Sequence, residues 1–85
     1  MSKLNDGFIR LNQDFFLDAN DIGKIISVIV QYGYYNMSSK YENCLLIELL
    51  TKDSLRPNAM TILWNGKLKY VSINNLNDIQ VKFLS

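Results

Sequence analysis

The stretch that decides the fold of this 85-residue chain is Met60-Thr61-Ile62-Leu63-Trp64-Asn65-Gly66-Lys67-Leu68-Lys69-Tyr70-Val71. An Asn-Gly pair stands at its centre, between two runs of the aliphatic and aromatic residues that are typical of strands. Asn and Gly tolerate the positive φ angles of a type I′ turn, the favoured two-residue connection of a β-hairpin. A loop of this length fixes the strand register. The predicted pairs are Trp64 with Lys67, Leu63 with Leu68, and Thr61 with Tyr70.

Further strands are predicted on both sides of this hairpin. Residues 22–32 are dense in β-branched side chains, which favour a strand. Their isoleucines also recur at helical spacing, with Asn20 or Asp21 as a possible N-cap, but Gly23 and the β-branching weigh against a helix. Residues 44–51 fit a strand, although their leucines also suit a partly helical segment. Shorter strands are predicted at residues 8–11 and 78–83, the latter with Ile79, Val81 and Phe83 on one face.

The segments between these strands carry turn and loop signals. Residues 12–21 are polar and predict a loop with one helical turn. Residues 34–43 predict a polar loop that bears tyrosines. Residues 52–58 predict a turn, since Pro57 fixes its own φ and disfavours a helical residue before it. Residues 72–76 predict a tight helical turn.

The composition excludes several classes of chemistry. The chain has no His and a single cysteine, Cys44, so a disulfide within the chain, a cysteine-rich zinc site and His-based nucleophile systems are ruled out. No paired carboxylates or Gly-rich phosphate loop appear, and Asp14, Asp18 and Asp21 lack the spacing of a calcium loop. We therefore expect a protein that is not an enzyme and that has no cofactor, metal or small-molecule substrate.

Charge and hydropathy bear on partners and location. The net charge of +1 disfavours nucleic acid as a partner, because nucleic-acid-binding domains are markedly more basic. The N-terminus shows no apolar signal-peptide region, and the longest apolar run, residues 25–32, is far shorter than a membrane span. We expect synthesis in a host cytoplasm and no association with membranes.

Two parts of the sequence resemble a known family. They are Gly23-Lys24-Ile25-Ile26-Ser27-Val28-Ile29 and, nearer the C-terminus, Ile62-Leu63-Trp64-Asn65-Gly66-Lys67 followed by Tyr70-Val71, Leu76 and Ile79. Together they resemble small SH3-like barrel proteins of tailed bacteriophages, especially T4-like phages of aquatic bacteria. The resemblance implies one SH3-like domain over residues 1–85, with five or six short strands and a C-terminal 3₁₀ turn. It also implies a structural protein of the virion, in a decoration, neck or tail accessory role.

The placement of apolar residues on both faces of the predicted strands points to a protein partner. Ile25 and Ile29 face opposite to Ile26, Val28 and Val30. In the same way, Leu46 and Leu50 face opposite to Leu45, Ile47 and Leu49, and Leu63 faces opposite to Met60, Ile62 and Trp64. A barrel of this size has one interior, so part of this set is expected outside unless loops cover it. Exposed apolar patches usually mark interaction sites.

Aromatic residues supply the candidate binding positions. Tyrosine and tryptophan give rigid amphipathic contact area and are enriched at binding hot spots. The candidate partner-binding residues are Tyr32, Tyr34, Tyr35, Tyr41, Trp64 and Tyr70. Packing within the barrel wall or a loop is the competing interpretation for each of them. The expected partners are other protein subunits, either virion proteins or further copies of the chain. The alternative function is a small regulatory module that acts on a host protein or nucleic acid.

Overall fold

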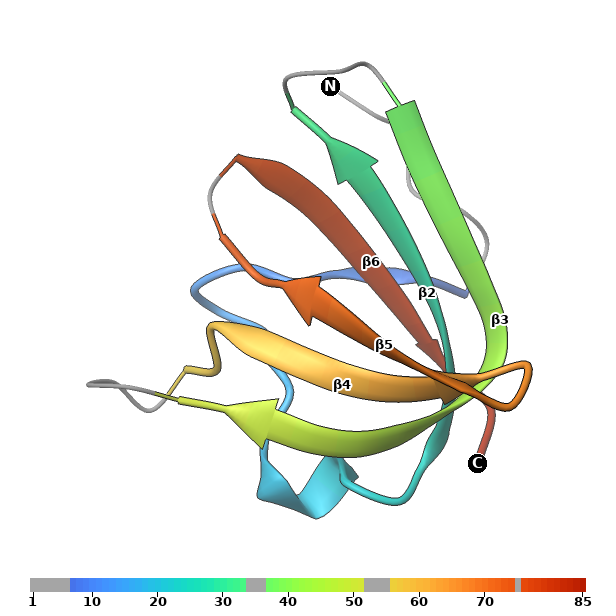
Figure 1. Cartoon of the computed structure of the whole chain (residues 1–85). Helices are drawn as coiled ribbons and strands as arrows, with labels where there is room; N and C mark the ends of the chain where they lie inside the picture. Colours follow the sequence, from blue (N-terminus) through green and yellow to red (C-terminus); the bar gives the residue numbers. More distant parts are fainter. Residues whose placement is uncertain (1–6, 34–36, 52–55, 75) are drawn as a thin grey trace.

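The computed structural model describes residues 7–33, 37–51, 56–74 and 76–85, which form one antiparallel sheet and one short 3₁₀ helix. The strands follow one another across the sheet in the order β1-β6-β2-β3-β4-β5. The elements, shown in Figure 1, are β1 (Ile9–Arg10), η1 (Ala19–Asp21), β2 (Ile25–Tyr32), β3 (Met37–Leu50), β4 (Ala59–Trp64), β5 (Lys67–Ser72) and β6 (Asn77–Phe83). The mainly β class expected from the sequence is confirmed.

Strands β4 and β5 form the hairpin that the sequence predicts. Its register pairs Trp64 with Lys67, Leu63 with Leu68, and Thr61 with Tyr70. Asn65 and Gly66 have φ angles of 51° and 75°, as the central positions of a type I′ turn require. The chemistry of the two turn residues therefore sets the register of the whole pair.

The segment at residues 22–32 forms a strand from Ile25 onward, which confirms the strand interpretation over the helical one. The helical turn expected within residues 12–21 is η1. Asp18 caps this helix: its carboxylate accepts a hydrogen bond from the Asn20 N–H at 2.9 Å, and the Asp21 carboxylate accepts one from the Asp18 N–H at 3.0 Å. This reciprocal capping box satisfies N–H groups that a short helix leaves free.

Strand β3 differs most from the sequence expectation. The loop predicted over residues 34–43 is wrong for residues 37–43, which form the first half of this 14-residue strand, while residues 34–36 lie outside the described residues. Pairing with β2 holds this half in place whatever the polarity of its side chains. The side chains that turn inward there, Ser39 and Tyr41, are only half-buried. A polar half-strand that pairs on one side only resembles a loop in sequence.

Two β-bulges bend β3. At the first, Glu42 and Asn43 lie opposite Ser27 of β2, and Asn43 takes a φ angle of 55°. At the second, Ile47 is the extra residue opposite β4, between Leu46 and Glu48. Each bulge inserts a residue, shifts the alternation of side chains and increases the local twist. The predicted grouping of Leu49 with Leu45 and Ile47 is therefore wrong, because Leu49 turns to the core together with Leu46.

Because it is bent, β3 pairs with strands in both halves of the sheet. Its first part pairs with β2 and its last part with β4, and Leu45 pairs with both Ile25 and Leu63. In Figure 1, β3 passes from the side of β2 and β6 round to that of β4 and β5. The end strands β1 and β5 do not pair with each other, so the sheet of the described residues is curled but open.

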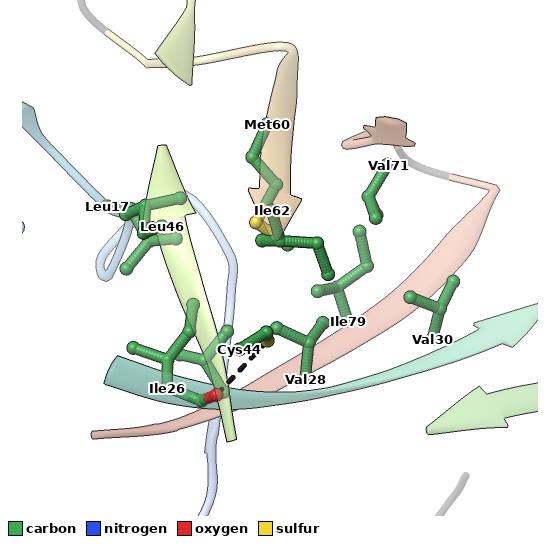
Figure 2. Packing of buried hydrophobic residues seen from close by; sticks show 11 residues of the cluster. Leu17, Ile26, Val28, Val30, Cys44, Leu46, Met60, Ile62, Val71 and Ile79 are labelled. Atoms are coloured by element: carbon green, nitrogen blue, oxygen red, sulfur yellow. Dashed lines mark hydrogen bonds between the residues drawn. The ribbon is translucent and has the colours of Figure 1, made fainter. Parts of the chain in front are cut away.

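The core lies inside this curl. Side chains from β2 to β6 meet there with Leu17, which comes from the loop before η1, as Figure 2 shows for most of them. The loop adds Phe15, whose ring meets that of Phe83 edge to face at 6.4 Å between centroids. The buried apolar residues of the cluster are Leu17, Ile26, Val28, Val30, Cys44, Leu46, Met60, Ile62, Val71, Ile79 and Val81. The predicted common face of Ile79, Val81 and Phe83 is confirmed by their packing in or against this cluster.

The connection from β5 to β6 corrects one expectation. The helical turn predicted at residues 72–76 is not a 3₁₀ helix in the described residues, since Ser72 ends β5 and the one such helix among them is η1. The side chain of Asn74 accepts a hydrogen bond from the Leu76 N–H at 2.9 Å. The Asn77 N–H also donates to the Asn74 carbonyl at 3.4 Å, an i to i+3 hydrogen bond that is not continued into a helix. Asn75 lies outside the described residues.

Candidate protein-binding surface

The outer face of the sheet, opposite the core, carries a row of aliphatic side chains. The register places Leu45 between Ile25 and Leu63, and Leu63 beside Leu68. Leu84 extends the row beyond the end of β6, because its N–H donates to the Ile25 carbonyl at 2.8 Å. Directly paired residues of antiparallel strands share a face. We call this set the outer apolar row: Leu84, Ile25, Leu45, Leu63 and Leu68.

The alternation of the strands shows that the row points away from the core. The chain neighbours Ile26, Cys44, Leu46 and Ile62 are all fully buried, and successive strand residues point to opposite faces. Within the row, Leu68 is 66% exposed and Leu84 43% exposed, while the residues between them are half-buried. The prediction that Ile25 and Leu63 face away from the buried set is confirmed.

Further exposed apolar side chains accompany the row. Tyr70, two residues after Leu68 on the same face of β5, is 64% exposed, and the bulge residue Ile47 is 38% exposed. A contiguous group of this kind on a small domain can bury apolar area against another protein, and such groups usually mark interaction sites. The arrangement favours recognition by apolar contact rather than by charge.

The four described aromatic residues among those predicted to bind a partner are not gathered in one place. Tyr32, Tyr41 and Trp64 are half-buried and pack against the core. Tyr34 and Tyr35 lie outside the described residues. Tyr70 alone of the described four is well exposed, and it lies beside the outer apolar row.

Trp64 and Tyr70 lie on opposite faces of the hairpin. Trp64 pairs with Lys67 and Tyr70 lies three residues further along β5, so the alternation separates them. The Trp64 ring meets that of Tyr41 at 5.1 Å between centroids and lies 6.0 Å from the Lys69 ammonium. The geometry matches the packing interpretation for Trp64 and leaves Tyr70 as the accessible aromatic group.

Several acidic side chains of the described residues take part in local capping and ion pairs. Those residues include no group of three His, Cys, Asp or Glu side chains that could hold a metal ion. Asp18 and Asp21 cap η1, and Asp21 also pairs with Lys24 at 2.9 Å. A shallow depression beside Trp64 is lined by Lys40, Glu42, Asn43 and Asn65, and Lys40 and Glu42 pair with each other there at 3.2 Å.

Cys44 is buried, as expected from its place at the start of an apolar run. Its thiol donates to the Ile26 carbonyl at 3.1 Å, the contact drawn as a dashed line in Figure 2. Burial raises the pKa of the thiol above its ordinary value. A buried, neutral thiol is a structural group rather than a nucleophile.

No family model, curated protein or solved structure matches the chain. No helix in the part of the chain that the structure describes is long and apolar enough to cross a membrane.

The complete row is the candidate functional feature that the sequence alone did not predict. The apolar outer positions on β2, β3 and β4 were recognisable from alternation, but their alignment depends on the register of β3 with both neighbours. Leu84 joins the row only because the chain continues its pairing with β2 after Phe83. The hairpin register predicted from the sequence places Leu68 beside Leu63. No other feature of the sequence indicated the exposed end of the row.

Proposed function

We propose that the chain is a non-enzymatic assembly protein that binds neighbouring protein subunits through the outer apolar row and Tyr70. The observation that carries the proposal is the unbroken line of aliphatic side chains from Leu84 to Leu68 on the face opposite the core. Burial of apolar area is the main driving force of protein association. A chain this short buries a smaller share of its surface on folding than a larger domain does, so a partner that covers the row adds to its burial.

The setting that we propose is the virion of a tailed bacteriophage, in a decoration, neck or tail accessory role. The sequence resemblance supports this setting. The curled sheet is consistent with the same family: the β4–β5 hairpin, the strongly bent β3 and a last strand that returns beside β2 are what an SH3-like barrel would contain. We accordingly propose that the domain is an opened variant of that barrel.

The experiment that tests this function is mass spectrometry of purified virions from the phage that encodes the chain. The expected result is the chain at a constant copy number per particle, in line with a symmetric structural role. Its absence from particles would remove the virion assignment. A shift of labelled DNA or RNA that weakens steeply with salt would instead support the regulatory alternative.

A pair of matched variants tests the surface. Leu63→Asp places a charge in the middle of the outer apolar row, and Met37→Asp places the same charge on another exposed apolar side chain, 62% exposed at the start of β3. Leu63→Asp should prevent incorporation into particles assembled in infected cells, while Met37→Asp should not. Circular dichroism of both variants shows whether they are folded. Equal incorporation of two folded variants would contradict the role of the row.

A further inference from the structure

Strand β5 has one edge that pairs with no other described strand, because it is the last strand in the sheet order. In a two-residue hairpin the residues that flank the turn form a hydrogen-bonded pair, and such pairs then alternate along the ladder. Trp64 and Lys67 flank the turn here, and the Ile73 N–H still donates to the Asn58 carbonyl at 2.9 Å. The backbone groups of Lys67, Lys69 and Val71 therefore point to β4. Those of Leu68, Tyr70 and Ser72 point to the free edge.

The side chains above this edge are apolar and accessible. Leu68 and Tyr70 are the two most exposed large hydrophobic residues of the described chain, at 66% and 64%. Proteins usually protect an exposed edge with charges, Pro or a bulge. The register of β4 with β5 shows no bulge, and the one proline of the chain, Pro57, lies outside β5. The two charged residues of β5, Lys67 and Lys69, lie on the face opposite Leu68 and Tyr70, and the Lys69 ammonium lies 6.0 Å from the Trp64 ring of its own chain.

We propose that β5 pairs with β5 of a second copy of this chain, antiparallel and about a two-fold axis at Tyr70. This inference deepens the proposed function, on which it rests for its biological purpose, by naming the first partner. Tyr70 then lies opposite Tyr70 of the second copy, and Leu68 lies opposite its Ser72. All the free backbone groups of Leu68, Tyr70 and Ser72 are used in this register.

The charges on the other face of β5 select this register over its neighbours. A two-fold axis at Lys69 would place Lys69 directly opposite Lys69 of the second copy. An axis at Leu68 would place Lys67 of each copy opposite Lys69 of the other. Like charges directly opposite each other destabilise a strand pair. An axis at Val71 avoids this clash but leaves Leu68 without a partner in β5. With the axis at Tyr70, Lys69 of each copy lies opposite Val71 of the other, and the aliphatic part of the Lys69 side chain packs against that valine.

Size and continuity favour a second copy as the occupant. Large Leu68 meets small Ser72 across the axis, and the same fit recurs at the symmetry-related position, as an isologous interface requires. The outer faces of both copies remain on the same side of the continued sheet. The two outer apolar rows then lie on one surface that is twice as wide as that of a single copy. A dimer built this way offers a larger docking site to the neighbouring subunits.

Disulfide trapping tests the register directly. Residues opposite each other in a hydrogen-bonded antiparallel pair have Cα atoms about 5.5 Å apart, which lies within the range of a disulfide. We would introduce Tyr70→Cys, Lys69→Cys and Leu68→Cys separately and oxidise each protein under mild conditions. The native cysteine is buried, so the new thiol is the accessible one. Non-reducing denaturing electrophoresis then reports the covalent dimer.

The expected result is a covalent dimer for Tyr70→Cys that runs as a single chain on denaturing electrophoresis after reduction. Lys69→Cys and Leu68→Cys should give no covalent dimer, because the two copies of each cysteine are separated by more than a disulfide can span. Faster cross-linking of Lys69→Cys, or no cross-linking of Tyr70→Cys, would overturn the proposed pairing. The two proposals fail separately. Absence of the chain from virions would not contradict the dimer. A Tyr70→Cys variant that does not cross-link would not contradict the role of the outer apolar row.

Discussion

The rings of Tyr41 and Trp64 meet edge to face, with centroids 5.1 Å apart and an interplanar angle of 82°. Tyr41 belongs to the half of β3 that pairs with β2, and Trp64 ends β4. The contact therefore joins the two halves of the bent sheet across its inner side. Aromatic pairs in this geometry add stability beyond the area that they bury.

Replacement of Trp64 by alanine should lower the free energy of unfolding by about 2–4 kcal/mol, since the change removes a large half-buried ring and its aromatic partner contact. Urea denaturation followed by circular dichroism measures the change without relying on tryptophan fluorescence. Met37→Ala is the matched control, because Met37 is exposed at the start of β3 and lies outside the hairpin. The control should change stability by no more than about 0.5 kcal/mol. Equal losses for both variants would show that the Trp64 contact is not structural.

The first bulge of β3 should depend on the residue at position 43. Asn43 has a φ angle of 55°, where side chains other than Asn and Asp are strained. Asn43→Ala should cost about 1 kcal/mol and Asn43→Gly much less, since glycine enters this region freely. Glu42→Ala, at the adjacent exposed position, is the control and should be nearly neutral. Thermal unfolding of the three variants checks the order, and a loss for glycine as large as that for alanine would contradict the strain argument.

The stability of the protein should fall at alkaline pH through Cys44. Burial raises the pKa of its thiol above the ordinary value of 9.0, so the folded state favours the neutral form. The stabilising contribution is complete below the unfolded pKa and is lost as the pH rises through the folded pKa, because the unfolded thiol ionises first. Urea unfolding at pH 7 to 10 should show a steeper alkaline loss for the wild type than for Cys44→Ala. Parallel pH profiles would mean that the thiol makes no contribution.

The ion pair between Arg10 and Asp78 should attach the short β1 to β6. Arg10 Nε lies 2.8 Å from Asp78 Oδ1, and Nη2 lies 3.4 Å from Oδ2. A double-mutant cycle with Arg10→Gln and Asp78→Asn should give a coupling energy of about 1 kcal/mol, since forked and partly buried pairs exceed typical surface pairs. The control pair, Lys40 and Glu42, is more exposed and should give a smaller coupling. A larger coupling for the control pair would contradict the assignment.

The parts of the fold that the sequence predicted correctly are those in which local chemistry is sufficient. Asn65 and Gly66 determine a turn whatever surrounds them, so the hairpin and its register followed from the sequence. The β-branched residues of β2 and the alternating apolar residues of β6 likewise predicted strands from local sequence alone. Strand β3 could not be predicted in this way, because its polar first half is a strand through pairing with β2. Its bulges at Asn43 and Ile47 also interrupt the period-two pattern.

The candidate site was predictable only in part for the same reason. Alternation showed that Ile25 and Leu63 could face outward, but it could not show that Leu45 lies between them. Tyrosine content pointed to residues whose exposure depends on the bend of the sheet. Tyr41 turned inward because β3 continues through residues 37–43 as a strand, whereas Tyr70 remained outside on the edge strand.

Leu45 lies at the junction of the two halves of the sheet, paired on one side with Ile25 and on the other with Leu63. Neither half can separate from the other without breaking the pairing at this residue. Opening should therefore spread inward from the edges at β1 and β5 and reach the middle of β3 last. In native-state hydrogen exchange, the amides around Leu45 and Leu46 should exchange only through global unfolding. The small sheet should accordingly unfold as one cooperative unit.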